Sequence, residues 1–183
     1  MRAAAELAGA APHERLLDLG TGTGGFLREL ADREPAPADV VGLDPSAAML
    51  HRVPRLRPGW HLIQAPGDRV PLPDGGFDVV VAGFLLHVLE PAQRATVLSE
   101  ARRLLARGGR LLVVTMAPPR TPALRILAAP VLALARRSEG TLAGLRALDP
   151  VPDLELAGFA VQAMRRTGGG YPAFVALATP VDG

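Results

Sequence analysis

The sequence predicts an α/β fold with a doubly wound, mostly parallel sheet. A short apolar strand at residues 15–19 runs into a glycine-rich turn and an amphipathic helix, and a second apolar run at residues 40–43 ends in Asp44. This order of elements is typical of a right-handed βαβ unit. A third run, residues 77–81, is apolar at nearly every position, as a strand buried on both faces of a parallel sheet should be.

The N-terminal elements follow from local signals. Residues 2–10 are rich in alanine and predict a short helix that ends at Gly9 or before Pro12. We expect residues 1–13 to form a small lid. The helix after the first strand places three apolar side chains inward: Phe26, Leu27 and Leu30.

The middle of the chain repeats the alternation of helix and strand. Pro45 and Ser46 open a helix that we expect to run to about Val53, and residues 60–64 predict a strand. A loop broken by prolines, residues 65–76, precedes the strand at 77–81. A helix from Pro91 is predicted to end at the glycines 108–109, before a strand at 110–115. Its expected inward residues are Ala95, Val97, Leu98, Ala101, Leu104 and Leu105.

The C-terminal third begins with a segment that does not continue the alternation of helix and strand. Prolines interrupt apolar segments between residues 116 and 150, which we expect to form lid or insert helices. A short helix at 152–157 then leads to strands at 159–165 and 172–178, which predict a hairpin around the glycines 168–170. We interpret residues 1–183 as a single domain, because no linker divides the chain.

Composition excludes several classes of function. The formal net charge is only +2, the basic residues are all arginine and scattered, and aromatic residues make up 4%. This composition does not favour nucleic acid as a partner. The chain has no cysteine, and its four histidines form no pair at metal-ligand spacing, so we expect no metal site. It also lacks an apolar stretch of membrane-spanning or signal-peptide length, and we expect it in the cytoplasm.

The glycine turn alone leaves two cofactors open. Residues 20–25 match the G-x-G-x-x-G pattern of dinucleotide-binding loops, and Asp44 stands near the position of a ribose-binding carboxylate, which favours NAD. Three further features argue against NAD. They are Asp18 ahead of the turn, the apolar run at 77–81 after an acidic proline-rich loop, and the closing hairpin.

With these features in order, the chain resembles a class I S-adenosylmethionine-dependent methyltransferase of the ubiquinone and menaquinone type. The matching runs are residues 17–24 (LDLGTGTG), 41–46 (VGLDPS), 77–80 (FDVV) and 105–111 (LARGGRL). The resemblance covers residues 15–178. It implies a Rossmann-like sheet of seven strands, the last antiparallel, with S-adenosyl-L-methionine as cofactor and S-adenosyl-L-homocysteine as product.

The resemblance also implies a set of cofactor-binding residues: Asp18, Gly20, Thr21, Gly22, Gly24, Asp44, Pro45, Gly67, Asp68 and Gly83. The methionine end of the cofactor would lie over the glycine loop, and Asp44 would accept both ribose hydroxyls. We expect Asp18 chiefly to brace the loop through backbone N–H groups, and Ser46 to cap its helix.

The adenine end departs from the family pattern. Relatives commonly have Gly-Asp-Ala a few residues before the proline-rich loop, where this chain has Ala-Pro-Gly at residues 65–67. The adenine amino group would then donate to Asp68, if the alignment shifts locally to bring Asp68 to the position of the family's aspartate, or to a main-chain carbonyl.

Methyl transfer needs alignment and exclusion of water, and a base only when the acceptor must lose a proton. His87, just after the strand at 77–81, is the candidate general base, with pocket lining as the alternative.

The expected acceptor is a small organic molecule: a quinone, a lipid headgroup or a secondary metabolite. Residues 116–147 or a second subunit of a homodimer would complete its pocket. The apolar segment 123–137 would pack as a lid helix, with peripheral membrane contact as the less favoured alternative. The alternative function is that of a non-catalytic module that binds the cofactor.

Overall fold

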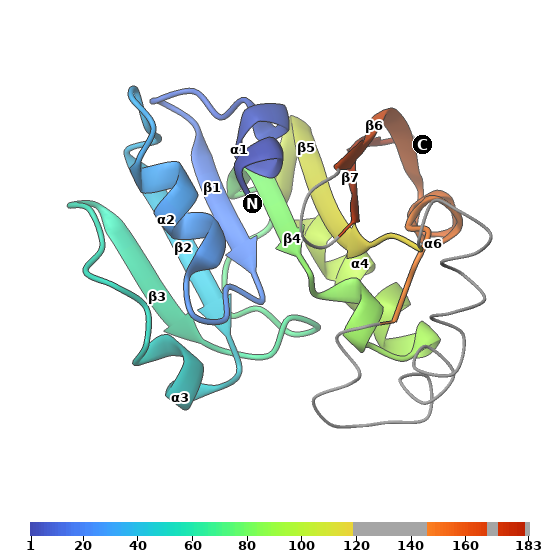
Figure 1. Ribbon diagram of the computed structural model, residues 1–183, viewed down its shortest axis with the longest axis horizontal. Helices are drawn as coiled ribbons and strands as arrows, with labels where there is room; N and C mark the ends of the chain where they lie inside the picture. Colours follow the sequence, from blue (N-terminus) through green and yellow to red (C-terminus); the bar gives the residue numbers. More distant parts are fainter. Residues whose placement is uncertain (119–145, 168–171, 182–183) are drawn as a thin grey trace.

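A seven-stranded sheet forms the centre of the molecule, with helices on both faces (Figure 1). The computed structural model describes residues 1–118, 146–167 and 172–181. The strands are β1 (Arg15–Leu19), β2 (Asp39–Asp44), β3 (Trp60–Gln64), β4 (Phe77–Gly83), β5 (Leu105–Met116), β6 (Phe159–Thr167) and β7 (Ala173–Pro180). The helices are α1 (Arg2–Ala8), α2 (Gly25–Ala31), α3 (Ala47–Leu50), the 3-10 turn η1 (Leu86–Val88), α4 (Pro91–Leu104) and α6 (Val151–Leu156).

The strand order is β3-β2-β1-β4-β5-β7-β6. The pairs from β3 to β5 are parallel, whereas β7 runs antiparallel to both β5 and β6. The predicted fold class, including the antiparallel last strand and the terminal hairpin, is confirmed.

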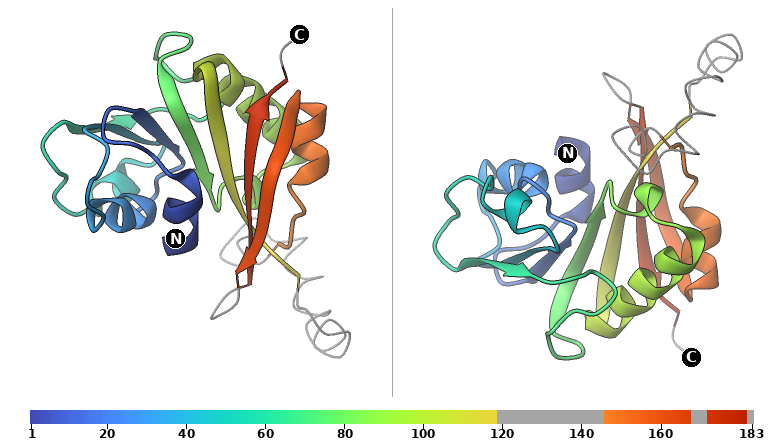
Figure 2. Two further views of the ribbon diagram at one scale, coloured as in Figure 1. Left: turned by 90° about the horizontal axis from the view of Figure 1, so that it is seen from above. Right: turned by 90° about the horizontal axis from the view of Figure 1, so that it is seen from below.

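Each face of the sheet has its own apolar core. On one face Leu16, Val79 and Val81 pack with residues of α1 and α2. On the other face Leu17 and Val80 pack with residues of α4 and α6. Figure 2 shows the two helix layers on opposite sides of the sheet. Successive residues of β1 and β4 thus face different cores, which is why these strands are apolar throughout.

Three sequence expectations about helices are wrong. Helix α3 ends at Leu50 instead of near Val53, because the side chain of Val53 turns in to pack beside Gly24 and Pro54 disfavours helical backbone before it. Helix α4 ends at Leu104, because the chain enters β5 at Leu105 and pairs there with β4, ahead of an irregularity in the ladder. Ala95 is exposed, not inward.

The N-terminal segment that carries α1 is fixed to the sheet by an ion pair. Arg110 of β5 binds both carboxylate oxygens of Glu14, at 2.7 and 2.9 Å, and donates to the carbonyls of Ala8 and Gly9 at the end of α1. The hydrogen bonds from Arg110 lower the pKa of Glu14 to about 2. The pair therefore holds α1 against the sheet.

Most of the expected lid region, residues 119–145, lies outside the described residues, as does the hairpin turn at 168–170. The predictions for helices in the first of these segments, including the segment 123–137, are therefore not tested. Within the part of the chain that is described, none of the helices has the length and apolar character needed to span a bilayer.

Candidate functional site

The candidate site lies where the strand order changes direction, between β1 and β4. Leu19 at the end of β1 pairs with Ala82 of β4, so that Gly20, which follows β1, and Gly83, the last residue of β4, come next at this edge. The helix after β1 covers one face and the helix after β4 covers the other. In open α/β sheets a crevice forms at such a switch point, outside the carboxyl ends of the strands.

The glycine loop after β1 needs left-handed backbone. Gly20 and Gly22 have φ values of +69° and +55°, which a β-carbon would disfavour. A β-carbon on Gly20 would lie 3.0 Å from the side chain of Leu85, whereas one on Gly22 would meet nothing within 4 Å. The loop therefore packs under Leu85 at Gly20 and presents open backbone at Gly22, as close approach of a ligand requires.

Asp18 braces this loop from below. Its side chain is buried, with 2% exposure, and it accepts a 2.6 Å hydrogen bond from the hydroxyl of Thr21. Burial, reinforced by the nearby charge of Asp44, raises the pKa of Asp18 to about 7, although the hydrogen bond from Thr21 opposes the shift. The expected contact with backbone N–H groups is thus replaced by a contact with a side-chain hydroxyl.

Asp44 stands at the end of β2 with both carboxylate oxygens oriented by backbone. One oxygen accepts from the N–H of Gly22 and the other from the N–H of Ser46, each at 2.9 Å. A carboxylate offers about four lone-pair sites, so acceptor capacity remains for a ligand's hydroxyl groups. Ser46 also caps α3, because its hydroxyl accepts from the N–H of Met49.

A cavity of about 220 Å³ adjoins the loop. Four of the predicted residues line it: Gly20, Pro45, Gly67 and Asp68. The sequence interpretation missed the others: Pro66, Leu85, Leu89, Gln93 and Val97. The lining is largely apolar, with Asp68 and Gln93 as the polar side chains, which suits a flat heteroaromatic ring with a polar edge.

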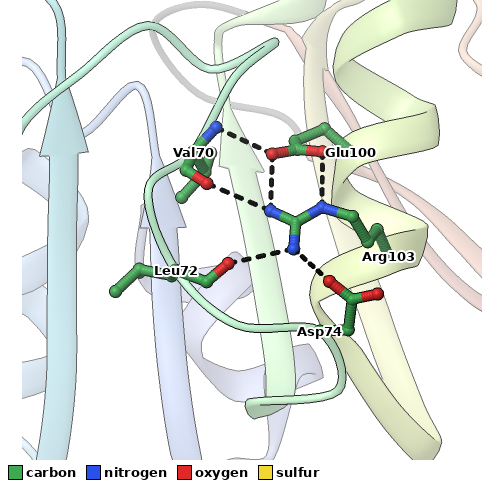
Figure 3. Close-up of polar contacts among 5 residues, drawn as sticks. All are labelled: Val70, Leu72, Asp74, Glu100 and Arg103. Atoms are coloured by element: carbon green, nitrogen blue, oxygen red, sulfur yellow. Dashed lines mark hydrogen bonds and ion pairs between the residues drawn. The ribbon is translucent and has the colours of Figure 1, made fainter.

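One wall of the cavity is the loop between β3 and β4, and α4 holds this loop through Arg103 and Glu100 (Figure 3). Arg103 donates to the carbonyls of Val70 and Leu72 at 3.0 and 2.9 Å and to the carboxylate of Asp74. Glu100 accepts from the N–H of Val70 at 2.7 Å. Ion pairing between Glu100 and Arg103 lowers the pKa of Glu100 and raises that of Arg103.

His87 lies in η1, directly after β4, and is 4% exposed. Its ring meets the ring of Phe84 edge to face, with centroids 5.8 Å apart. Phe84 has a φ of +56°, a strained value for an aromatic residue, and such strain is concentrated at functional sites. Neither residue lines the 220 Å³ cavity. His87 thus lies at the carboxyl end of β4 without lining this cavity.

The remaining predicted residues complete the loop and the strand end. Gly24, with φ +75°, is the N-cap residue of α2 and packs against Val53. Gly83 ends β4, and a β-carbon there would lie 2.9 Å from the side chain of Met1. The described residues hold no cluster of three or more histidine, aspartate or glutamate side chains suited to a metal ion.

Comparison with known proteins agrees with this geometry. The family model "Methyltransferase domain" matches residues 16–109, slightly more than half of the chain. A demethylmenaquinone methyltransferase of Beutenbergia cavernae is 39% identical over 118 residues, which are 64% of this chain and 47% of that protein. A malonyl-[acyl-carrier protein] O-methyltransferase of Legionella pneumophila is 36% identical over 57% of this chain and 37% of its own length.

Among solved structures, an S-adenosylmethionine-dependent methyltransferase of Methanosarcina mazei superposes with a TM-score of 0.73 at 17% identity and covers 94% of each chain, which shows the shared fold. The chain spans about half the length of the curated relatives it matches. From the family match and the site geometry together, the chain belongs to the class I S-adenosylmethionine-dependent methyltransferase family.

Proposed function

We propose that this chain binds S-adenosyl-L-methionine at the carboxyl ends of β1, β2 and β4 and transfers its methyl group to a small organic acceptor. The observation that carries the proposal is Asp44. Its carboxylate is fixed by the N–H groups of Gly22 and Ser46 beside a mostly apolar cavity. Membership of the family sets aside the dinucleotide alternative.

The residues present fit the cofactor. Asp44 retains acceptor sites for the two ribose hydroxyls, in a charge-assisted contact. The open backbone at Gly22 receives the methionine end, and Thr21, held by Asp18, keeps the loop in shape. The adenine ring enters the cavity beside Pro45, and Gly67 and Asp68 face its polar edge.

The bound cofactor supplies an electrophilic methyl group on a sulfonium. The chain's own part is to align the acceptor with that methyl group and to exclude water, which together lower the barrier of an in-line displacement. For an acceptor with a hydroxyl or an acidic carbon, His87 is the proposed general base, because it is buried directly after β4 at the strand ends.

A quinone-type acceptor is favoured by the relatives, of which several are named demethylmenaquinone methyltransferase and one acts, by its name, on malonyl-[acyl-carrier protein]. We infer a small-molecule partner in place of nucleic acid, because several of the arginines that the structure describes form ion pairs within the chain. Arg15, Arg57, Arg103 and Arg110 each pair with a carboxylate of the same chain.

Isothermal titration with S-adenosyl-L-homocysteine tests the proposal. We expect micromolar binding and, for Asp44→Ala, an affinity at least about 100-fold lower, because two backbone donors lose their acceptor along with the ribose contact. Asp32→Ala removes an exposed carboxylate at the end of α2 and should bind as the unmodified chain does.

If S-adenosyl-L-homocysteine does not bind, or if NADH binds in its place, the proposal is contradicted. Cofactor binding without methyl transfer to any member of a panel of quinols, phospholipid headgroups and phenols would instead identify a non-catalytic module.

A further inference from the structure

The structure assigns Arg103 as a positioning residue for adenine recognition, although it lies outside the cavity. We infer that its guanidinium holds the loop that carries Gly67 and Asp68 at a fixed separation from α4. This separation sets the preference for adenine, with its amino group, over a base that has a carbonyl at that position. The inference rests on the proposed function.

All five N–H groups of the Arg103 guanidinium are used. Nε and Nη2 bind the two oxygens of Glu100, at 2.8 and 2.7 Å. The second Nη2 donor reaches the carbonyl of Val70, and the two Nη1 donors reach the carbonyl of Leu72 and the carboxylate of Asp74. A planar fork with five donors matches five acceptors on two elements (Figure 3), and no other side chain has this donor set.

Backbone contacts complete the attachment. The N–H of Gly75 donates to the carbonyl of Arg103 at 2.9 Å, and the N–H of Val70 donates to Glu100. Val70 itself is buried in the core, with 5% exposure. The loop is therefore held at Val70, Leu72, Asp74 and Gly75 by one turn of α4.

The fixed part of the loop flanks the part that lines the cavity. On its other side the loop is tied to β2, since the N–H of Ala65 donates to the carbonyl of Asp44 at 3.3 Å. Residues 66–68, between these two attachments, line the cavity. Their distance from the opposite wall is therefore set by the attachment at Val70.

Helix α4 also supplies the opposite wall. Gln93 and Val97 line the cavity, and Glu100 meets the loop, at a spacing that places the three on one helix face. One rigid helix thus carries both a wall of the cavity and the clamp that positions the facing wall. The width of the cavity depends on Arg103 in consequence.

Arg103→Lys is the sharpest variant, because it keeps the positive charge and the aliphatic stem. An ammonium offers three donors without a planar fork, so at most three of the five contacts can form. Arg102→Lys is the matched control. Arg102 is the neighbouring residue of α4, and its guanidinium binds the carbonyls of Gly158 and Val181, away from the loop.

The measurement is calorimetric titration of each variant with S-adenosyl-L-homocysteine and with S-inosyl-L-homocysteine, in which a carbonyl replaces the adenine amino group. For Arg103→Lys we expect affinity for the adenine ligand to fall about tenfold, which corresponds to the loss of one well-placed hydrogen bond. Affinity for the inosine ligand should change by less than about threefold, so the preference between them shrinks. Arg102→Lys should leave the preference unchanged.

An equal loss for both ligands in Arg103→Lys, or an unchanged preference, would overturn the inference and leave Arg103 a purely structural residue. Thermal melts confirm that each variant is folded. If Arg103→Lys does not fold, Glu100→Gln replaces it with the same expectation, since its amide keeps the shape of the carboxylate and loses the charge. Failure of the unmodified chain to bind either ligand would count against the proposed function instead.

Discussion

The two ends of the candidate cofactor site are built in different ways. At the ribose end, Asp44 and the glycine loop bind one another directly, through backbone N–H groups at the ends of adjacent strands. At the adenine end, the loop of residues 65–76 is shaped by Glu100 and Arg103 of α4, which lie about 30 positions after the loop residues they bind. The first end is a product of the sheet itself, whereas the second depends on side chains outside the site.

The largest expected effect on stability comes from breaking the adenine-end clamp at Glu100. Glu100→Ala leaves the N–H of Val70 and two donors of Arg103 without their acceptor, so we expect a loss of about 3 kcal/mol in the free energy of unfolding. Urea denaturation measures it. Glu155→Ala, which removes an exposed carboxylate from α6, should change stability by less than about 0.5 kcal/mol. A similar small effect for Glu100→Ala would mean that the loop does not depend on the clamp.

At the ribose end, the buried carboxyl of Asp18 makes stability depend on pH. Its pKa in the folded chain is about 7, above the ordinary value of 3.8, so the folded state binds the proton more tightly than the unfolded state. The charged form therefore destabilises the fold above pH 7, and this cost is relieved as the pH falls from 7 toward 4. From pH 5 to pH 8 we expect the unmodified chain to lose on the order of 2 kcal/mol relative to Asp18→Asn.

Denaturation of both proteins at the two pH values measures this difference. Parallel pH profiles for the unmodified chain and Asp18→Asn would show that Asp18 is already ionised in the fold.

A smaller effect distinguishes two glycines of the same loop. Gly20→Ala combines a positive φ with a contact of 3.0 Å to Leu85, and we expect a cost of about 1–2 kcal/mol. Gly22→Ala has the positive φ but open space, and should cost about 1 kcal/mol while reducing cofactor affinity more strongly. Thermal melting measures the stability of both variants, and titration with S-adenosyl-L-homocysteine measures their affinity. Normal binding by Gly22→Ala would contradict the predicted role of Gly22 in the cofactor site.

The same contrast explains which parts could be predicted from the sequence. Strands β1 and β3 were predicted to the residue, and Asp44 and the glycine loop follow from short-range patterns at strand ends. Gln93 could not be recognised as a cavity residue, because a polar position on an amphipathic helix is ordinarily exposed. The role of Arg103 could not be recognised, because its pair with Glu100 is an ordinary i,i+3 pair on a helix and its three other acceptors lie about 30 residues earlier in the chain. The end of α4 was misplaced because the pairing with Phe77 that starts β5 is a tertiary contact.

The most direct test is a crystal structure of this chain with S-adenosyl-L-homocysteine bound. We predict that both ribose hydroxyls contact the carboxylate of Asp44 and that the adenine ring lies between residues 66–68 and α4, with its amino group toward the loop. A ligand found elsewhere, such as in the open groove between α1 and the end of α2, or a ribose turned away from Asp44, would contradict the account.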